Sequence, residues 1–243
     1  MTASPATPRP VDEPRLLWRD EHAAVLHKPS GMLVHNSAWA GPAEHTLRDA
    51  VASELGDDWH PVHRIDRGTS GAVLFARGAA IAALADALQR DDARKHYLAG
   101  VRGRLTGDHI VERPVPDSGG VPRDARSRVL GLRVSTHAHA SLVRVELFTG
   151  RTHQARRHVR SLGHPVIGDA NWGNSRFNRE MRAAWGIDRL ALHAAHLSWL
   201  DPVLSQVVAI EAPLPPDLTA PFEAMGIWPP PDALDAGRRT TPA

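Results

Sequence analysis

One short polar segment divides two apolar stretches in the first third of the chain: His63-Arg64-Ile65-Asp66-Arg67-Gly68-Thr69-Ser70-Gly71. It follows the apolar approach at residues 59–62 and precedes residues 72–75, whose composition is typical of a buried strand. The segment must therefore connect two elements of a packed core, and its two glycines suit a turn. Any fold of this chain has to place that turn beside a central strand.

Asp66 lies inside this turn, between Arg64 and Arg67. Two neighbouring cations favour the ionised form of a carboxyl group, and an ionised carboxylate on a rigid loop is a candidate nucleophile. A lone aspartate in such a loop is more often a turn former, whose side chain only pins the backbone. This segment alone leaves both roles open for Asp66.

Length and composition are those of an ordinary globular protein. The 243 residues suffice for one large domain or two small ones, and 42% of them are hydrophobic. The absence of cysteine excludes disulfides and thiolate metal sites. No apolar run approaches the length of a membrane span, and the proline-rich N-terminus has no secretory signal, so we expect a cytoplasmic protein.

The charge balance bears on possible partners. The formal net charge is only +2, although the chain carries 29 Lys and Arg residues and 15 His. This balance argues against a nonspecific polycation, so a nucleic-acid site would need local clustering of charge. Arginine greatly outnumbers lysine, and arginine suits bidentate phosphate contacts and stacking on bases.

Periodicity predicts a chain of mixed α and β structure. We expect a disordered leader over residues 1–14, a folded domain over residues 15–228 and a disordered tail over residues 229–243. Residues 107–128, rich in proline and arginine, are expected to form an irregular basic loop. Strands are predicted at residues 16–18, 23–26, 72–75, 95–101, 141–148 and 207–210, and helices at residues 46–55, 79–90 and 151–162.

Two further segments carry candidate site residues. Tyr97, the only tyrosine in the chain, lies in the strand-like segment at residues 95–101. Residues 150–158 close a strand and begin a basic helix, in which Arg151 at the entrance suits an anion, and Arg156, Arg157 and Arg160 form a cationic ridge. By themselves these features fit an ordinary strand residue and a solvated helix face.

Taken together, the segments resemble the motifs of the RluA-type RNA pseudouridine synthases. That family has an Arg-Leu-Asp, two variable residues and a Thr-Ser-Gly where this chain has residues 64–71, with Ile65 in place of the leucine. It also has a Lys-Xaa-Tyr that matches residues 95–97 and an Arg-Thr-His-Gln that matches residues 151–154. Residues 164–169 and 189–194 continue the match in the same order.

The resemblance implies an α+β fold, in which a bent, mixed, mostly antiparallel central sheet is flanked by helices. It implies that residues 15–228 form a catalytic domain that flips a uridine out of RNA and isomerises it to pseudouridine without a cofactor or metal. Asp66 would attack the nucleotide, at ribose C1′ or at uracil C6. Tyr97 would stack on the base and help to remove its C5 proton, and Arg151 would pair with Asp66.

The resemblance also implies substrate contacts and an RNA partner. Arg64 would fill the vacated stack or bind a phosphate, Leu192 would pack beside the base, and Thr69, Arg156 and Arg157 would bind the RNA. Residues 173–192 are similar to the branch of the family that modifies uridine 65 in the T stem of tRNA. A synthase acting on ribosomal RNA remains the alternative. We expect a monomer without membrane partners.

Two other classes compete with this interpretation. His60 and His63, like His193 and His196, are spaced as two metal ligands of a hydrolase could be, although core or surface histidines explain them better. A noncatalytic RNA-binding module of the same fold is a second alternative. The presence of Asp66, Tyr97 and Arg151 together argues against such a module.

Overall fold

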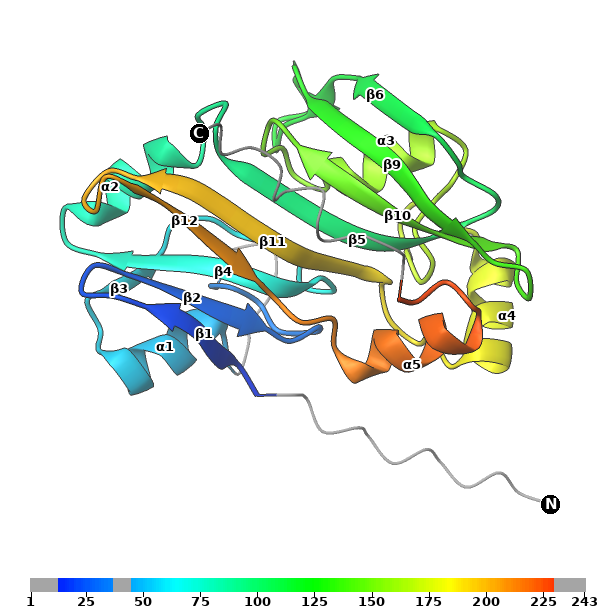
Figure 1. The fold of residues 1–243 in the computed structure, drawn as a ribbon, viewed down its shortest axis with the longest axis horizontal. Helices are drawn as coiled ribbons and strands as arrows, with labels where there is room; N and C mark the ends of the chain where they lie inside the picture. The colour runs from blue at the N-terminus through cyan, green and yellow to red at the C-terminus, as the bar shows by residue number, and fades with distance from the viewer. Residues whose placement is uncertain (1–12, 37–44, 230–243) are drawn as a thin grey trace, which may run out of the picture.

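The computed structural model describes residues 13–36 and 45–229, which Figure 1 shows in colour. Most of the expected leader (1–14) and tail (229–243) therefore lies outside the described residues. No described helix is long and apolar enough to cross a membrane. Five helices are present in this part of the chain: α1 (Leu47–Leu55), α2 (Ala80–Ala87), α3 (Gln154–Ser161), α4 (Ser175–Trp185) and α5 (Pro216–Ala224).

Ten strands form one sheet at the centre of the described chain. They are β1 (Arg15–Arg19), β2 (Ala23–Lys28), β3 (Trp59–Pro61), β4 (Ser70–Arg77), β5 (Arg94–Arg102), β6 (Asp108–Glu112), β9 (Arg126–Val134), β10 (Ala140–Leu147), β11 (Leu192–Asp201) and β12 (Gln206–Glu211). Their order is β1-β2-β4-β11-β5-β10-β9-β6, with β3 paired to β4 and β12 to β11. The short strands β7 (Val115–Pro116) and β8 (Pro122–Arg123) pair separately.

The strand β11 joins the two halves of this sheet (Figure 1). It runs parallel to β4 and antiparallel to β5, and the other pairings between named strands of the described chain are antiparallel. The parallel contact is close at Gly71, where a Cβ atom would lie 2.2 Å from the carbonyl oxygen of Ala194. Gly71 also has a φ of +119°, which favours glycine. The predicted mixed, mostly antiparallel sheet is confirmed.

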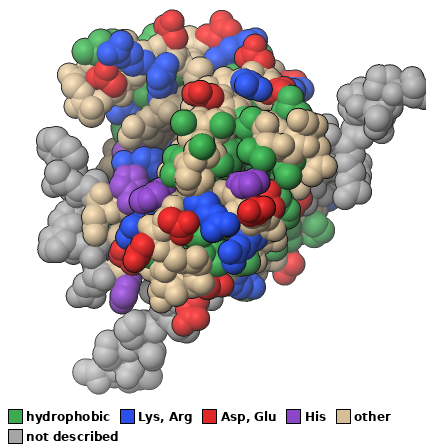
Figure 2. Space-filling view, turned by 90° about the vertical axis from the view of Figure 1, so that its left-hand side faces the viewer, with side chains coloured by type: hydrophobic (Ala, Val, Ile, Leu, Met, Phe, Trp, Pro, Cys, Tyr) green, Lys and Arg blue, Asp and Glu red, His purple; other side chains and the backbone are tan. Residues whose placement is uncertain are grey.

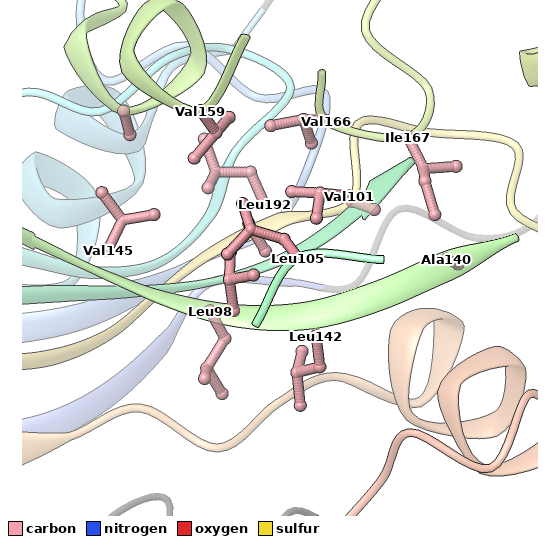
Figure 3. Packing of buried hydrophobic residues seen from close by; sticks show 14 of the residues in the cluster. Leu98, Val101, Leu105, Ala140, Leu142, Val145, Val159, Val166, Ile167 and Leu192 are labelled. Carbon is pink, nitrogen blue, oxygen red and sulfur yellow. The ribbon is translucent and has the colours of Figure 1, made fainter. Parts of the chain in front are cut away.

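Two helices cover opposite faces of the half-sheet formed by β5 and β10. Figure 3 shows Val145 on the side of Val159, which belongs to α3, and Leu142 on the opposite side. On that second side Phe222 of α5 approaches so closely that a Cβ at Gly100 would lie 2.8 Å from its ring. These contacts belong to one core cluster of buried residues, which fixes α3 against the sheet.

Several boundaries differ from the expectation. The helix predicted from residue 151 begins at Gln154, because His153 adopts a left-handed backbone conformation (φ 57°) that cannot continue a helix. Residues 107–128 are not one irregular loop, since they contain β6, β7, β8 and the start of β9. The helix predicted at residues 46–55 is confirmed as α1, and Thr46 and Asp49 form a capping box at its start.

The surface is not uniformly basic. Figure 2 shows acidic and basic side chains interspersed with apolar ones over the end of the molecule that lies on the left of Figure 1. This mixture agrees with the small net charge of +2. Any site for a polyanion must therefore depend on particular arginines rather than on the charge of a whole face.

Candidate active site

The loop between β3 and β4 presents Asp66 and is tied to the chain that follows β2. Within the loop, the amide of Thr69 donates to the carbonyl oxygen of Asp66 at 3.0 Å. Across to the neighbouring segment, the amide of Gly31 donates to Arg67 O at 2.8 Å, and Ser30 Oγ donates to Gly68 O at 2.8 Å. The backbone on both sides of Asp66 is thereby held in place.

A buried lysine supports the same loop. Lys28 is fully buried, and its Nζ donates to the carbonyl oxygens of Pro29 (2.8 Å), Met32 (2.7 Å) and Arg67 (3.2 Å). Burial, followed by the positive charge of Arg189, lowers the pKa of Lys28 to about 7. The lysine therefore connects the segment at residues 29–32 to the loop that carries Asp66.

Arg156 is the partner of Asp66. Its Nη1 lies 3.0 Å from Asp66 Oδ2, and its side chain is almost fully buried. The expected pairing of Asp66 with Arg151 is wrong, because Arg151 precedes the left-handed turn at His153 and is exposed, with Nε donating to Asp124 O at 3.1 Å. The helix α3 instead turns Arg156 toward the interior of the site.

A second carboxylate orients Arg156. Asp169 accepts two hydrogen bonds of 2.8 Å from the Nε and Nη2 atoms of Arg156, and two more from the amides of Asn171 and Trp172. Burial by itself would raise the pKa of Asp169, but these hydrogen bonds outweigh it and keep the pKa below its usual value. Asp169 thus stays ionised and fixes the plane of the guanidinium.

The two oxygens of Asp66 have different surroundings. Oδ2 accepts the hydrogen bond from Arg156, whereas Oδ1 lies 3.7 Å from the Nε2 atom of His153, which is beyond hydrogen-bonding distance. The Asp66 side chain keeps 23% of its surface exposed. Oδ1 is therefore the oxygen available to a molecule that enters the site.

Asp66 opens onto a pocket of about 300 Å³. Tyr97 of β5 and Leu192 at the start of β11 line this pocket together with Arg64, Thr69, Arg151 and Arg156. Burial and the negative charge of Asp66 raise the pKa of Tyr97, so its hydroxyl remains protonated at neutral pH. A flat phenol and an apolar leucine beside a carboxylate suit a planar ring with polar edges.

The predicted RNA-contacting residues fall in different environments. Arg64 is exposed beside the pocket, and no ion pair among the described residues includes it. Thr69 is 1% exposed, and its hydroxyl has no hydrogen-bond partner among the residues described. Arg157 does not line the pocket with Arg156; its guanidinium carbon lies over the indole of Trp172, 4.8 Å from the ring centroid.

Three of the histidines spaced like metal ligands, His63, His193 and His196, have protein partners instead. His63 Nε2 accepts from the amide of Leu74 at 3.1 Å. His193 is fully buried, and its ring nitrogens lie 2.9 Å from Ser70 Oγ and 3.0 Å from Ala212 O. His196 stacks on His96 and pairs with Glu211. In the part of the chain that the structure describes, no three His, Asp or Glu side chains converge as for a metal ion.

Sequence reasoning missed three residues of this site. They are Lys28, Asp169 and Trp172, none of which the motifs single out as a site residue. Their contacts in the structure reveal them. Lys28 donates a hydrogen bond to a carbonyl oxygen of the loop, and Asp169 accepts hydrogen bonds from Arg156. The guanidinium of Arg156 lies 4.6 Å from the ring centroid of Trp172. A buried charge cannot be told from an exposed one by residue type alone.

Known proteins of similar sequence indicate the same family as the motifs do. Residues 22–161 match the family described as RNA pseudouridylate synthase. The tRNA pseudouridine synthase C of Pasteurella multocida strain Pm70 is 34% identical over 221 residues, which cover 80% of this chain and 89% of that protein. The ribosomal large subunit pseudouridine synthase C of Escherichia coli K12 is 37% identical over 221 residues, covering 82% of this chain and 66% of that protein.

A solved structure shares the fold. Human RNA pseudouridylate synthase domain containing 1 superposes with a TM-score of 0.70 at 24% sequence identity. The match covers 93% of this chain and 100% of that one. At this level of identity the likeness concerns the arrangement of strands and helices.

Proposed function

Because this chain belongs to the RluA-type RNA pseudouridine synthases, enzymes that isomerise uridine to pseudouridine in RNA, we propose that it modifies a uridine in the T stem of tRNA, with Asp66 as the nucleophile. The observation that carries the assignment of Asp66 is its geometry. One carboxylate oxygen is held by Arg156, and the other faces a pocket large enough for a nucleobase.

The tRNA target is supported by the relatives. The tRNA pseudouridine synthase C of P. multocida matches across 89% of its own length. Residues 173–192, which form α4 and the approach to β11, also resemble the tRNA branch. Ribosomal RNA is the second candidate, because the E. coli ribosomal enzyme reaches 37% identity over the same length.

The reaction requires the target base to leave the RNA stack, because a stacked nucleotide hides both its glycosidic bond and its C5 atom. In our proposal the flipped uridine enters the pocket between Tyr97 and Leu192. Asp66 Oδ1 then attacks, at C1′ or at C6. Arg156 aims Asp66 through a charge-assisted hydrogen bond, while Asp169 balances the charge of Arg156.

The isomerisation balances within one nucleotide. The N1–C1′ bond breaks, the uracil turns, C5 bonds to C1′, the bond from Asp66 to the nucleotide is broken again, C5 loses a proton and N1 gains one. We propose that Tyr97 supplies a flat face for the turning base and a hydroxyl near C5. Because its phenol is held protonated, Tyr97 would accept the C5 proton only as it passes its own proton onward.

We assign the surrounding residues to RNA binding. Arg64 and Arg151 are exposed where they line the pocket, so both are placed to contact phosphates or the vacated stack. The unpartnered hydroxyl of Thr69 is a hydrogen-bonding group for the nucleotide. We also propose that the enzyme acts as a cytoplasmic monomer.

The test uses transcripts labelled with tritium at uridine C5. We expect the wild-type enzyme to release tritium from tRNA, and Asp66→Asn to bind the same tRNA with unchanged affinity but to release none. A tRNA carrying cytidine in place of the T-stem uridine is the matched substrate control. Release from 23S ribosomal RNA alone would replace the tRNA assignment by the ribosomal one, and activity of Asp66→Asn would refute the nucleophile.

A further inference from the structure

Three side chains that can carry a positive charge lie against the indole of Trp172. The guanidinium carbons of Arg156 and Arg157 lie 4.6 and 4.8 Å from its ring centroid, and the imidazole of His153 packs edge-on at 5.0 Å with an interplanar angle of 65°. Two of these groups, Arg156 and His153, are also the two that face Asp66. The indole therefore touches both neighbours of the nucleophile.

The backbone around Trp172 is firmly held. Its amide donates to Asp169 Oδ1 at 3.0 Å, and the next amide, of Gly173, donates to Asp169 O at 3.0 Å. That same carbonyl accepts from Asn178 Nδ2 of α4 at 3.0 Å. A Cβ at Gly173 would lie 2.2 Å from Asp169 O, so the turn packs against itself without space to shift.

The charged side chains around Trp172 explain why an aromatic face is needed at this position. Arg156 and Arg157 carry like charges and share one ring, while the carboxylates of Asp66 and Asp169 both bind Arg156. Repulsion from Arg157 would push the Arg156 guanidinium out of the plane that reaches Asp66 Oδ2. The electron-rich face of an indole attracts both cations and offsets this repulsion.

We propose that Trp172 is a positioning residue for the reaction: its indole face holds the Arg156 guanidinium in the orientation that aims Asp66, and its edge fixes His153 on the other side of the same carboxylate. This inference rests on the proposed role of Asp66 for its kinetic consequence. The orientation of Arg156 itself can be measured without any RNA.

The test compares two smaller replacements, one aromatic and one not. Trp172→Phe keeps an aromatic face, whereas Trp172→Met fills the space without one. We expect Trp172→Met to lower kcat roughly tenfold, the size of a cation–π contact of a buried pair, with KM within about twofold of wild type. Trp172→Phe should recover most of the rate. Trp18→Met, at a half-buried tryptophan of β1 that packs edge-on against Trp199, is the control and should keep the wild-type kcat.

The second measurement is the guanidinium resonance of Arg156 in the protein without RNA. A side chain held over an indole gives an Nε–H signal shifted upfield by the ring current, assigned by its loss in Arg156→Lys. We expect this shift to disappear in Trp172→Met, together with the slow solvent exchange of the proton.

The outcomes are separable. Equal kcat in wild type and Trp172→Met, or equal losses in the Met and Phe variants, would overturn the proposal. A rise in KM at unchanged kcat would make Trp172 an RNA contact and would overturn it as well. If the wild-type enzyme acts on neither RNA, the proposed function fails, while the Arg156 resonance still decides whether Trp172 orients the guanidinium.

Discussion

Asp169 and Arg156 form a buried bidentate ion pair, with 2.8 Å for each of its two hydrogen bonds. The remaining terminal nitrogen of the same guanidinium reaches Asp66 Oδ2 at 3.0 Å. The candidate nucleophile is thus aimed by an arginine that is itself aimed by a second carboxylate. Replacing any one of these three residues should affect the other two.

Arg156→Gln should abolish turnover and destabilise the fold by roughly 3–5 kcal/mol, because it leaves the buried carboxylate of Asp169 without its counter-charge. Urea unfolding and tritium release measure the two effects. Arg151→Gln is the control: its exposed side chain should leave stability unchanged and raise KM more than it lowers kcat. The double variant Arg156→Leu/Asp169→Leu should regain stability but not activity; if it were active, Arg156 would not be needed to aim Asp66.

Tyr97 should resist ionisation far beyond the range of a free phenol. As the only tyrosine in the chain, it can be followed directly by the tyrosinate absorbance at 295 nm. We expect no tyrosinate in the folded protein at pH 10–11 and a normal titration near pH 10 in urea, because burial and the Asp66 charge raise the folded pKa.

The same shift has a consequence for stability. Above pH 10 the unfolded chain loses the Tyr97 proton first, so the free energy of unfolding should decrease as pH rises through that range. Asp66→Asn should bring the titration of Tyr97 to lower pH by removing one of its two causes. An unchanged titration in Asp66→Asn would contradict the electrostatic contact between the two residues.

His193 should make the protein sensitive to acid. Burial, followed by the charges of His27 and Arg189, lowers its pKa to about 3, although the hydrogen bond to Ala212 opposes the shift. Between pH 6.5 and 3 the unfolded state therefore binds a proton that the folded state does not. As the pH is lowered through this range, the free energy of unfolding decreases by up to about 1.4 kcal/mol per pH unit. Urea unfolding at pH 7.5, 6.0 and 5.0 measures this slope, which should be shallower in His193→Gln. Parallel slopes for both proteins would show that His193 does not contribute.

Lys28→Met should slow catalysis through the loop that carries Asp66, and not through a contact with the substrate. The substitution removes the donor shared by the carbonyls of Pro29, Met32 and Arg67, with an expected cost of about 1–3 kcal/mol of stability. Because Arg67 adjoins Asp66, kcat should fall while RNA affinity is retained. Ser30→Ala, which loses a single contact to Gly68, should show a smaller change in the same direction. Wild-type kcat in Lys28→Met would remove the lysine from the support of the loop.

The elements that follow local rules were predictable from the sequence. The capping box of α1, the hairpin of β1 and β2, and the buried strand after Asp66 depend on residues close together in the chain. The strand β11 was not predicted, because its insertion between β4 and β5 is set by pairing with residues about a hundred positions away. The helix α4 was also missed, since most of its residues are polar and its support comes from tertiary contacts such as that of Asn178.

The candidate site could likewise be predicted from the sequence only in part. The position of Asp66 in a turn and of Tyr97 on a strand could be inferred from sequence, as could the arginine-rich helix. Which arginine meets Asp66 could not, because one residue, His153, takes a left-handed conformation and rotates the start of α3. That rotation exposes Arg151 and buries Arg156, and residue type alone does not signal it.

The insertion of β11 also decides when the enzyme becomes active during its synthesis. The strands β1 to β4 and the strands β5 to β10 are made first, yet in the sheet β4 and β5 do not pair with each other, because β11 lies between them and joins the two halves. Asp66 and Arg156 belong to these two separate halves. A nascent chain therefore has no complete site until residues 192–201 have been translated, when about four-fifths of the protein has been made.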